Sequence, residues 1–141
     1  MRTTLTILAC LAAFSLAACG DDSDDATEGG EEAEATVSAD QAIVEIKAVR
    51  GGLDEALLAY EEGDAAAAEE AATDAYLEHF ELVEGPLEET DEELNEELEI
   101  LIRETLGEAI ASDAPVAEVE KLVEEANAGL DDAEAQLEKA G

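Results

Sequence analysis

The sequence is short of the residue types on which most catalytic sites depend. It has no tryptophan, one histidine, two cysteines, two prolines and six lysines and arginines, against 40 aspartates and glutamates. It contains no HExxH, GxSxG, P-loop or GxGxxG motif, which excludes the common metalloprotease, hydrolase and nucleotide-binding sites. A single histidine cannot supply the two Glu-x-x-His pairs of a di-iron carboxylate bundle. We therefore expect that the protein is not an enzyme.

The scarcity of basic residues also limits the partners. The formal net charge is −34, and a surface this anionic repels nucleic acid and anionic lipid headgroups. Nucleic acid is therefore not an expected partner. Cations, basic proteins or a salty environment suit such a surface, and most of the carboxylates are expected to be solvated.

Residues 1–18 have the features of an export signal. Arg2 precedes an apolar run that is too short to span a membrane. The run ends in Leu16-Ala17-Ala18-Cys19, which resembles the lipobox of bacterial lipoproteins. We predict that Cys19 is lipidated and anchors the protein to the periplasmic or cell-surface side of a membrane; the alternative is an ordinary cleaved signal. Cys10 would be removed with the signal, so no disulfide is expected.

Residues 19–38 are predicted to be a disordered acidic tether. They consist almost entirely of Asp, Glu, Ser, Thr, Gly and Ala, and such a segment cannot bury enough apolar surface to offset the entropy of ordering. The acidic run at residues 21–25 could instead bind a cation, but it lacks the glycine and terminal glutamate of a calcium loop.

From residue 39 to residue 141 the apolar positions recur with a helical period, and no strand alternation is present. Ser38 and Gln41 form a capping-box pattern at the start, and Gly63-Asp64 marks the first helix end. Gly51 and Gly52 predict a weak, kinked middle in the first helix. We predict an all-α domain, an up-down-up-down antiparallel four-helix bundle.

The other helix boundaries are predicted from punctuation residues. Gly85-Pro86 should end the second helix, and Thr90 should cap the third. The third helix is expected to bury Leu94, Leu98, Leu101, Ile102, Thr105 and Ala109. Ser112-Asp113, with Pro115 just inside, should open the fourth helix. That helix carries a heptad of Val116, Val119, Val123, Ala126, Leu130, Ala133 and Leu137.

The second helix holds the only histidine and half of the aromatic residues. Tyr76, Phe80, Val83 and Leu87 share its apolar face. His79 lies at the shoulder of that face, where it is either a hydrogen-bonded, partly buried histidine or a metal ligand. In the second case Glu81 and Glu84, three residues apart, would join His79 as ligands of iron, copper or zinc.

Two arginines differ in their predicted surroundings. Arg50 falls within the apolar stripe of the first helix, at about the same height as Tyr76, so its charge must either be paired or reach out to solvent. The expected partner is a carboxylate of this layer or the Tyr76 hydroxyl. An anion or substrate site is the alternative for this polar layer in the core. Arg103 faces outward and follows Glu99 by four residues, which predicts an ordinary surface ion pair.

A resemblance to a known family rests on several of these motifs. Gly63-Asp64-Ala65-Ala66-Ala67-Ala68, residues 75–84 (AYLEHFELVE), Glu97-Leu98-Glu99 and Leu101-Ile102-Arg103-Glu104 resemble the extracytoplasmic helical domain associated with bacterial high-affinity iron permeases of the ferric-transporter family. The chain has neither the membrane bundle nor the Arg-Glu-x-x-Glu motif of those permeases, and it lacks the Gly-x-His-x-x-Glu of imelysin-like proteins. The resemblance therefore implies an accessory role beside an iron permease. The matching positions are Tyr76, Phe80, Glu81, Glu84, Glu99 and Arg103.

Two functions follow from the sequence. In the first, the protein is a membrane-anchored lipoprotein that binds or delivers iron, or another divalent or trivalent cation, for an uptake system. In the second, it is an acidic structural or protein-docking lipoprotein with no metal role.

Overall fold

The computed structural model describes residues 37–141, where the chain is helical apart from its connections and contains no strand. The expected all-α class is thus confirmed for this part of the chain. The predicted export signal, Cys19 and nearly all of the tether lie outside the described residues. No helix within residues 37–141 is both long and apolar enough to cross a bilayer.

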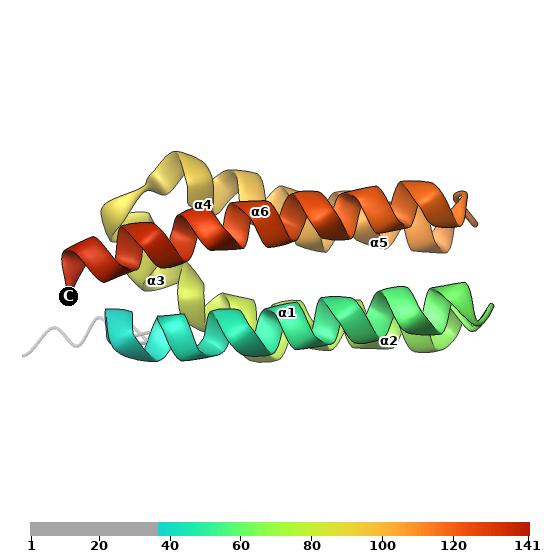
Figure 1. Cartoon of the computed structure of the whole chain (residues 1–141), viewed down its shortest axis with the longest axis horizontal. Helices are drawn as coiled ribbons and strands as arrows, with labels where there is room; N and C mark the ends of the chain where they lie inside the picture. Colours follow the sequence, from blue (N-terminus) through green and yellow to red (C-terminus); the bar gives the residue numbers. More distant parts are fainter. Residues whose placement is uncertain (1–36) are drawn as a thin grey trace, which may run out of the picture. The chain divides into compact units, whose positions relative to one another are not determined.

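Four helices make up the described part of the chain. The first is α1 (Ala39–Glu61) and the last is α6 (Val116–Ala140). The second helix joins α2 (Ala65–Asp74), the π-helical segment η1 (Ala75–Phe80) and α3 (Glu81–Thr90) without a break. The third joins α4 (Glu92–Glu99), the π-helical segment η2 (Ile100–Thr105) and α5 (Leu106–Ala111). Helix α1 packs against both α2 and α6, and Figure 1 shows the helices side by side.

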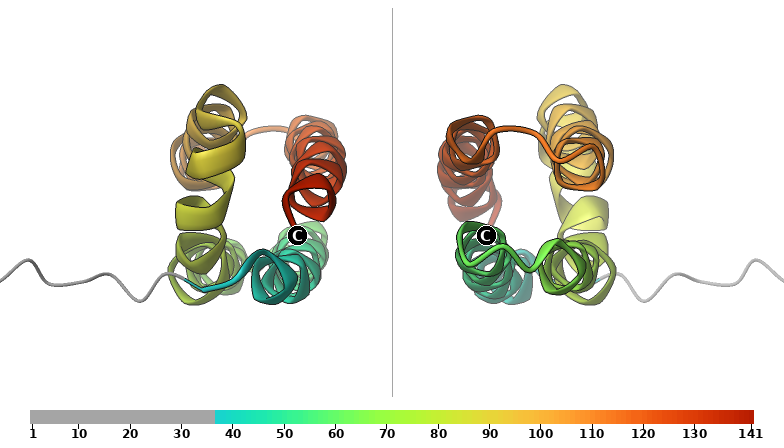
Figure 2. Two further views of the ribbon diagram at one scale, coloured as in Figure 1. Left: turned by 90° about the vertical axis from the view of Figure 1, so that its left-hand side faces the viewer. Right: turned by 90° about the vertical axis from the view of Figure 1, so that its right-hand side faces the viewer.

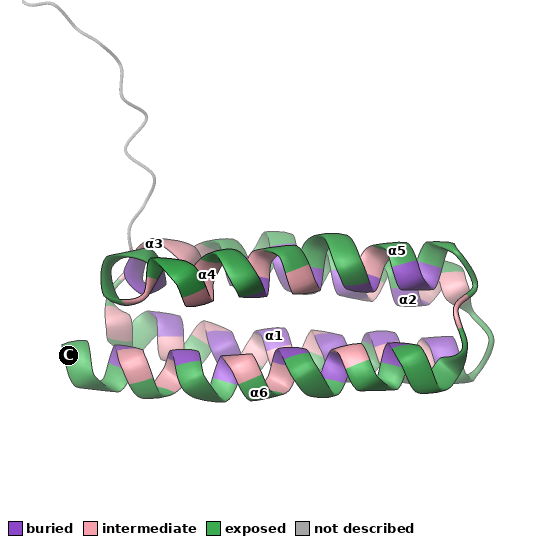
Figure 3. Cartoon of the chain, turned by 90° about the horizontal axis from the view of Figure 1, so that it is seen from above, coloured by how far each residue is buried: buried purple, intermediate pink, exposed green. Residues whose placement is uncertain are grey.

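One apolar core lies between the four helices. Figure 3 shows the buried residues as a stripe along each helix, with exposed residues between them. In α1 the buried positions are separated alternately by four and three residues: Ala42, Ile46, Val49, Leu53, Ala56 and Tyr60. Helix α6 follows the same rule, with Val119, Val123, Ala126, Leu130, Ala133 and Leu137. This is the heptad spacing that keeps one face of a helix toward its neighbours. The predicted core of α6 is confirmed except for Val116, which is 41% exposed.

The two middle helices bury residues at intervals of four. One line of buried residues on the third helix is Leu98, Ile102, Leu106 and Ile110, and one on the second is Ala68, Ala72, Tyr76 and Phe80; Ala109 and Ala75 are buried beside these lines. Because an α-helix has 3.6 residues per turn, repeated steps of four drift around its axis. A π turn absorbs this drift by accommodating one extra residue. The expected burial of Thr105 is therefore wrong: Thr105 is exposed in η2, and Leu106 takes the core position.

The first helix hairpin forms as the sequence predicts. Ser38 and Gln41 make the reciprocal capping box of α1, Gly63 has a φ of 85°, and Asp64 accepts a hydrogen bond from the Ala67 amide as the cap of α2. The expected kink at the glycines is wrong, because α1 is a single α-helix through both. A Cβ atom on Gly52 would lie 2.7 Å from the Ala75 Cβ, so this glycine allows α1 and η1 to approach closely.

Pro86 does not end the second helix, contrary to the prediction. Pro86 and Leu87 are both buried, and α3 continues past them to Thr90. Figure 2 shows α3 crossing obliquely from the side of α2 to the side of α4, as expected of a helix that contains a proline. The Thr90 hydroxyl donates to the Leu87 carbonyl at 3.0 Å, and Asp91 rather than Thr90 caps α4 by accepting from the Leu94 amide.

The connection before α6 also differs from the prediction. Ser112 ends α5, with its hydroxyl bonded to the Ala109 carbonyl, and Pro115 directly precedes α6. Asp113 has a φ of 55°, the left-handed conformation of a tight turn. Asp113 therefore lies in the connection and does not cap α6. The Tyr60 hydroxyl donates to the Ala114 carbonyl at 2.6 Å and ties this connection to the end of α1. At the other end of the molecule, Gly141 lies beside Asp40 at the start of α1 (Figure 1).

Candidate functional site

A cluster of four polar side chains joins the second and third helices near their π-helical segments. Tyr76 comes from η1, Glu84 from α3, Glu99 from the end of α4 and Arg103 from η2. We call these four residues the Tyr76 cluster. They come from two helices that are separate along the chain, so only the folded domain brings them together.

The Tyr76 hydroxyl is the centre of the cluster. It donates a hydrogen bond to Glu84 Oε1 at 2.9 Å and lies 3.5 Å from Glu99 Oε1. Arg103 Nη1 donates to the same Glu99 oxygen at 2.9 Å, and the guanidinium stands 5.7 Å from the centre of the Tyr76 ring. One phenol oxygen, two carboxylates and one cation therefore form a connected network.

Burial makes two groups of the cluster, the Tyr76 hydroxyl and the Glu84 carboxyl, hold their protons more tightly. Tyr76 is buried, and its pKa is raised by this burial, by its hydrogen bond to Glu84 and by the charges of Glu84 and Glu99. The pKa of Glu84 is raised by burial and by the charges of Glu99 and Glu81, while the Tyr76 hydrogen bond and Arg103 partly oppose the shift. A cation at this point would compete with these protons.

The π turns place the cluster. In η1 the Glu81 amide donates to the Tyr76 carbonyl, five residues back, and in η2 the Leu106 amide donates to the Leu101 carbonyl in the same way. The Thr105 hydroxyl bonds the Ile100 carbonyl at 3.2 Å and so satisfies a backbone group in the widened turn. Single π turns within α-helices occur frequently at functional sites, so this pairing of two of them marks the cluster as the candidate site.

The three predicted metal ligands do not come together. His79 points to α1, where its Nδ1 lies 2.8 Å from Glu45 Oε2. Glu84 belongs to the Tyr76 cluster, and Glu81 is exposed. Within residues 37–141 no three His, Cys, Asp or Glu side chains are grouped so that they could hold a metal ion. The structure therefore favours the interpretation of His79 as a hydrogen-bonded, partly buried residue.

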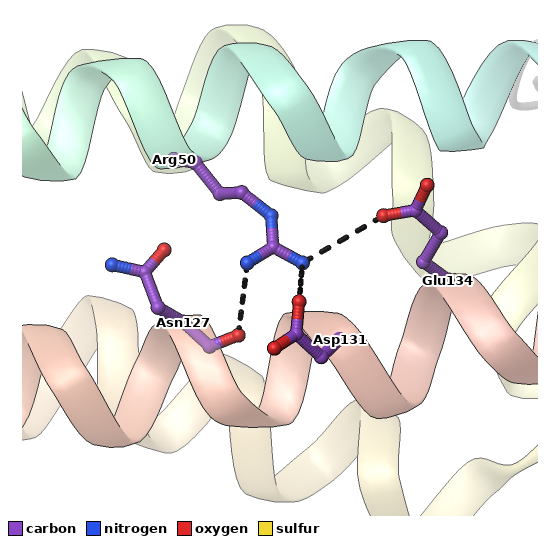
Figure 4. Close-up of polar contacts among 4 residues, drawn as sticks. All are labelled: Arg50, Asn127, Asp131 and Glu134. Atoms are coloured by element: carbon purple, nitrogen blue, oxygen red, sulfur yellow. Dashed lines mark hydrogen bonds and ion pairs between the residues drawn. The ribbon is translucent and has the colours of Figure 1, made fainter.

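Arg50 is paired with carboxylates, which is one of the two kinds of partner expected from the sequence. Its partners all lie on α6 (Figure 4). Nη1 donates to the Asn127 carbonyl at 3.0 Å, and Nη2 lies 2.6 Å from Asp131 and 3.7 Å from Glu134. Arg50 does not bond the Tyr76 hydroxyl, because its guanidinium bonds α6 whereas the Tyr76 hydroxyl bonds Glu84 and Glu99.

Of the six positions singled out by the resemblance, four form the Tyr76 cluster. Phe80 is a core residue whose ring centre lies 5.9 Å from that of Tyr76, and Glu81 is on the surface. The predicted Arg103–Glu99 pair is confirmed, although it is more than a surface pair because it contacts Tyr76. Sequence reasoning missed Glu45 as the partner of His79, since nothing in the spacing within one helix identifies a partner on another.

No protein-family model, no curated protein and no solved structure matches the chain. The resemblance to the iron-permease domain therefore stays a prediction.

Proposed function

We propose that this protein is an exported, lipid-anchored accessory module that captures a hard metal cation such as ferric iron and passes it to an uptake protein. The Tyr76 cluster carries the proposal, because a buried phenol and two carboxylates from two helices already share one hydrogen-bond network. Phenolate and carboxylate oxygens are hard donors, which suit iron better than soft metals. In this proposal Tyr76, Glu84 and Glu99 are the ligands, and His79 and Glu81 are not.

In this proposal a bound metal cation replaces positive charge that the cluster already holds as protons. The incoming cation takes the place of the Tyr76 proton and of any proton on Glu84, both of which are held more tightly than usual. Arg103 would have to leave Glu99, and this movement costs little because 56% of its side chain is exposed. The need to displace protons predicts an affinity that rises with pH, and the adjacent arginine favours capture that is reversible.

The proposal also includes the topology of the bundle and its attachment to a membrane. Short connections between consecutive helices support an up-down-up-down antiparallel bundle. Lipid on Cys19 and an acidic tether over residues 19–38 would hold this bundle at the membrane, which raises its effective concentration near a membrane partner. An iron permease is the partner that the sequence resemblance suggests.

A spectroscopic titration tests the proposal. Ferric ion, supplied as a soluble weak chelate, should produce the visible charge-transfer absorption of a ferric–phenolate bond. Tyr76→Phe should abolish this absorption. Tyr60→Phe is the matched control, because Tyr60 is the other tyrosine and its hydroxyl binds only the Ala114 carbonyl. Absence of the band in the unaltered protein, or its equal loss in both variants, would contradict the proposal.

The second candidate is an acidic structural or docking lipoprotein without a metal role. It is favoured by the absence, within residues 37–141, of any group of three His, Cys, Asp or Glu side chains suited to a metal. It predicts that metal ions leave the free energy of unfolding unchanged. A specific ligand at a hundredfold excess over its Kd should instead add about 2.7 kcal/mol, so calorimetry with and without ferric ion separates the two candidates.

A further inference from the structure

A groove of about 600 Å³ runs between the second and third helices, beside the Tyr76 cluster. One wall is formed by α2 and η1 from Glu69 to Leu77, and the other by η2 and α5 from Ile102 to Ala111. Each wall is about 12 Å long at 1.5 Å per residue, which equals about two turns of an α-helix.

The residues that line this groove are mainly of two kinds, small or apolar residues and charged ones. Three of the residues that line it, Ala72, Gly107 and Ala111, are small, and the side chain of Leu77 is 51% exposed at its edge. At the rim, one wall carries the exposed carboxylate of Glu69, and the other carries those of Glu104 and Glu108 together with the guanidinium of Arg103. The groove is therefore apolar between borders on which carboxylates outnumber the single cation.

We propose that this groove binds a basic amphipathic helix of another protein. A helix fits between two parallel walls when its apolar stripe lies on small residues, and its lysines and arginines would then reach the acidic rim. The charge of the chain argues against other occupants. A second copy would bring another net charge of −34 to the same surface, and an acidic partner would be repelled in the same way. The inference does not depend on metal binding, since it rests on the shape and charge of the residues that line the groove.

Two glycines provide a matched pair of variants. A Cβ atom on Gly107 meets nothing within 4 Å, so Gly107→Leu starts a larger side chain from open space in the lining of the groove. The same holds for Gly51, an exposed glycine within α1 that does not line the groove. Both substitutions replace a helical glycine by a good helix former, so their effects on folding should be similar.

The probe is a fluorescent helical peptide of leucine and lysine whose leucines recur at i, i+3, i+4 and i+7. A scrambled peptide of the same composition controls for charge attraction alone. We expect the amphipathic peptide to bind the unaltered, metal-free protein about tenfold more tightly than the scrambled one, a difference of about 1.4 kcal/mol. Gly107→Leu should reduce its affinity by about tenfold, and Gly51→Leu should leave it unchanged.

A second pair of variants tests the rim. Glu104→Gln/Glu108→Gln removes two rim charges, and Glu120→Gln/Glu124→Gln removes two exposed carboxylates of the same spacing on α6. Only the first pair should weaken binding, beyond the small change that any loss of net charge produces. The proposal is overturned if the two peptides bind equally, or if Gly107→Leu behaves like Gly51→Leu. It is also overturned if sedimentation shows a dimer of this chain that Gly107→Leu dissociates.

Discussion

Helices α1 and α6 differ from the two helices between them in both regularity and polar content. In α1 and α6 the buried residues alternate in steps of four and three, and their polar contact, from Arg50 to Asn127 and Asp131, lies at the edge of the core. The middle helices each contain a π turn, and their polar contact is centred on the buried Tyr76. The regular helices thus bond through groups at the edge of the core and at a helix end, whereas the irregular ones hold a polar network of side chains around a buried tyrosine.

Deleting one residue should destabilise a regular helix much more than a helix with a π turn, and this is the largest effect that we expect. Deletion of exposed Glu124 from α6 would rotate Leu130, Ala133 and Leu137 out of the core, because the helix has no spare residue. We expect the free energy of unfolding to fall by about 5 kcal/mol or more. Deletion of exposed Leu77 from η1 removes the extra residue of the π turn, so it should leave the bundle folded. Urea denaturation followed by circular dichroism measures both effects, and equal losses would contradict the account of η1.

The two adjacent glycines of α1 should respond in opposite directions. The added Cβ of Gly52→Ala would stand 2.7 Å from the Ala75 Cβ, so we expect a loss of about 1–3 kcal/mol from overpacking. Gly51→Ala meets open space and should gain up to about 1 kcal/mol through helix propensity. Thermal unfolding of both variants checks this. A stable Gly52→Ala variant would show that α1 and η1 can separate without loss.

The two arginines should also be unequal. Arg50 is 23% exposed and bonds a backbone carbonyl as well as Asp131, so Arg50→Met should cost about 1–2 kcal/mol. Arg103 is more than half exposed, so Arg103→Met should cost less than Arg50→Met. A double-mutant cycle of Arg50→Met with Asp131→Asn isolates the pair. If both substitutions lower the free energy of unfolding equally, the bonds from Arg50 to α6 stabilise the fold no more than an exposed ion pair does.

The smallest expected effect is a shift in one titration. The Glu84 carboxyl should titrate above the usual value of 4.5, because burial raises its pKa. A group with a raised pKa in the folded state stabilises the fold while it is protonated, so its contribution is lost as the pH rises from 4.5 through the raised value. Carboxyl ¹³C NMR measures the titration. Tyr76→Phe should raise the pKa of Glu84 further, because the Tyr76 hydrogen bond opposes the shift; a decrease would contradict this assignment.

The regular half of the fold could be read from the sequence because its signals are local. The capping box at Ser38, the turn at Gly63 and the heptad of α6 each depend on residues close together in the chain. Pro86 misled the prediction, since burial of Pro86 and Leu87 overrides its tendency to end a helix. The π turn of the third helix does have a signal in the sequence, the steps of four from Leu98 to Ile102 to Leu106.

The candidate site was less accessible to sequence reasoning. Tyr76, Glu84, Glu99 and Arg103 were singled out by resemblance, but nothing in their spacing showed that they meet. The predicted grouping of His79 with Glu81 and Glu84 relied on neighbours within one helix. Tertiary packing instead pairs His79 with Glu45, 34 residues earlier in the chain. Contacts across helices depend on how far each helix is rotated, and the extra residue in η1 changes that rotation.

The contact between Gly141 and Asp40 has a practical consequence. Because α6 ends where α1 begins, a short glycine linker could join these two ends and leave the helices in place. New termini could then be opened at Gly63, whose Cβ position faces open space at the opposite end of α1. Such a circular permutant would present the domain from its other end, and a reporter could be attached there without touching the Tyr76 cluster or the groove beside it.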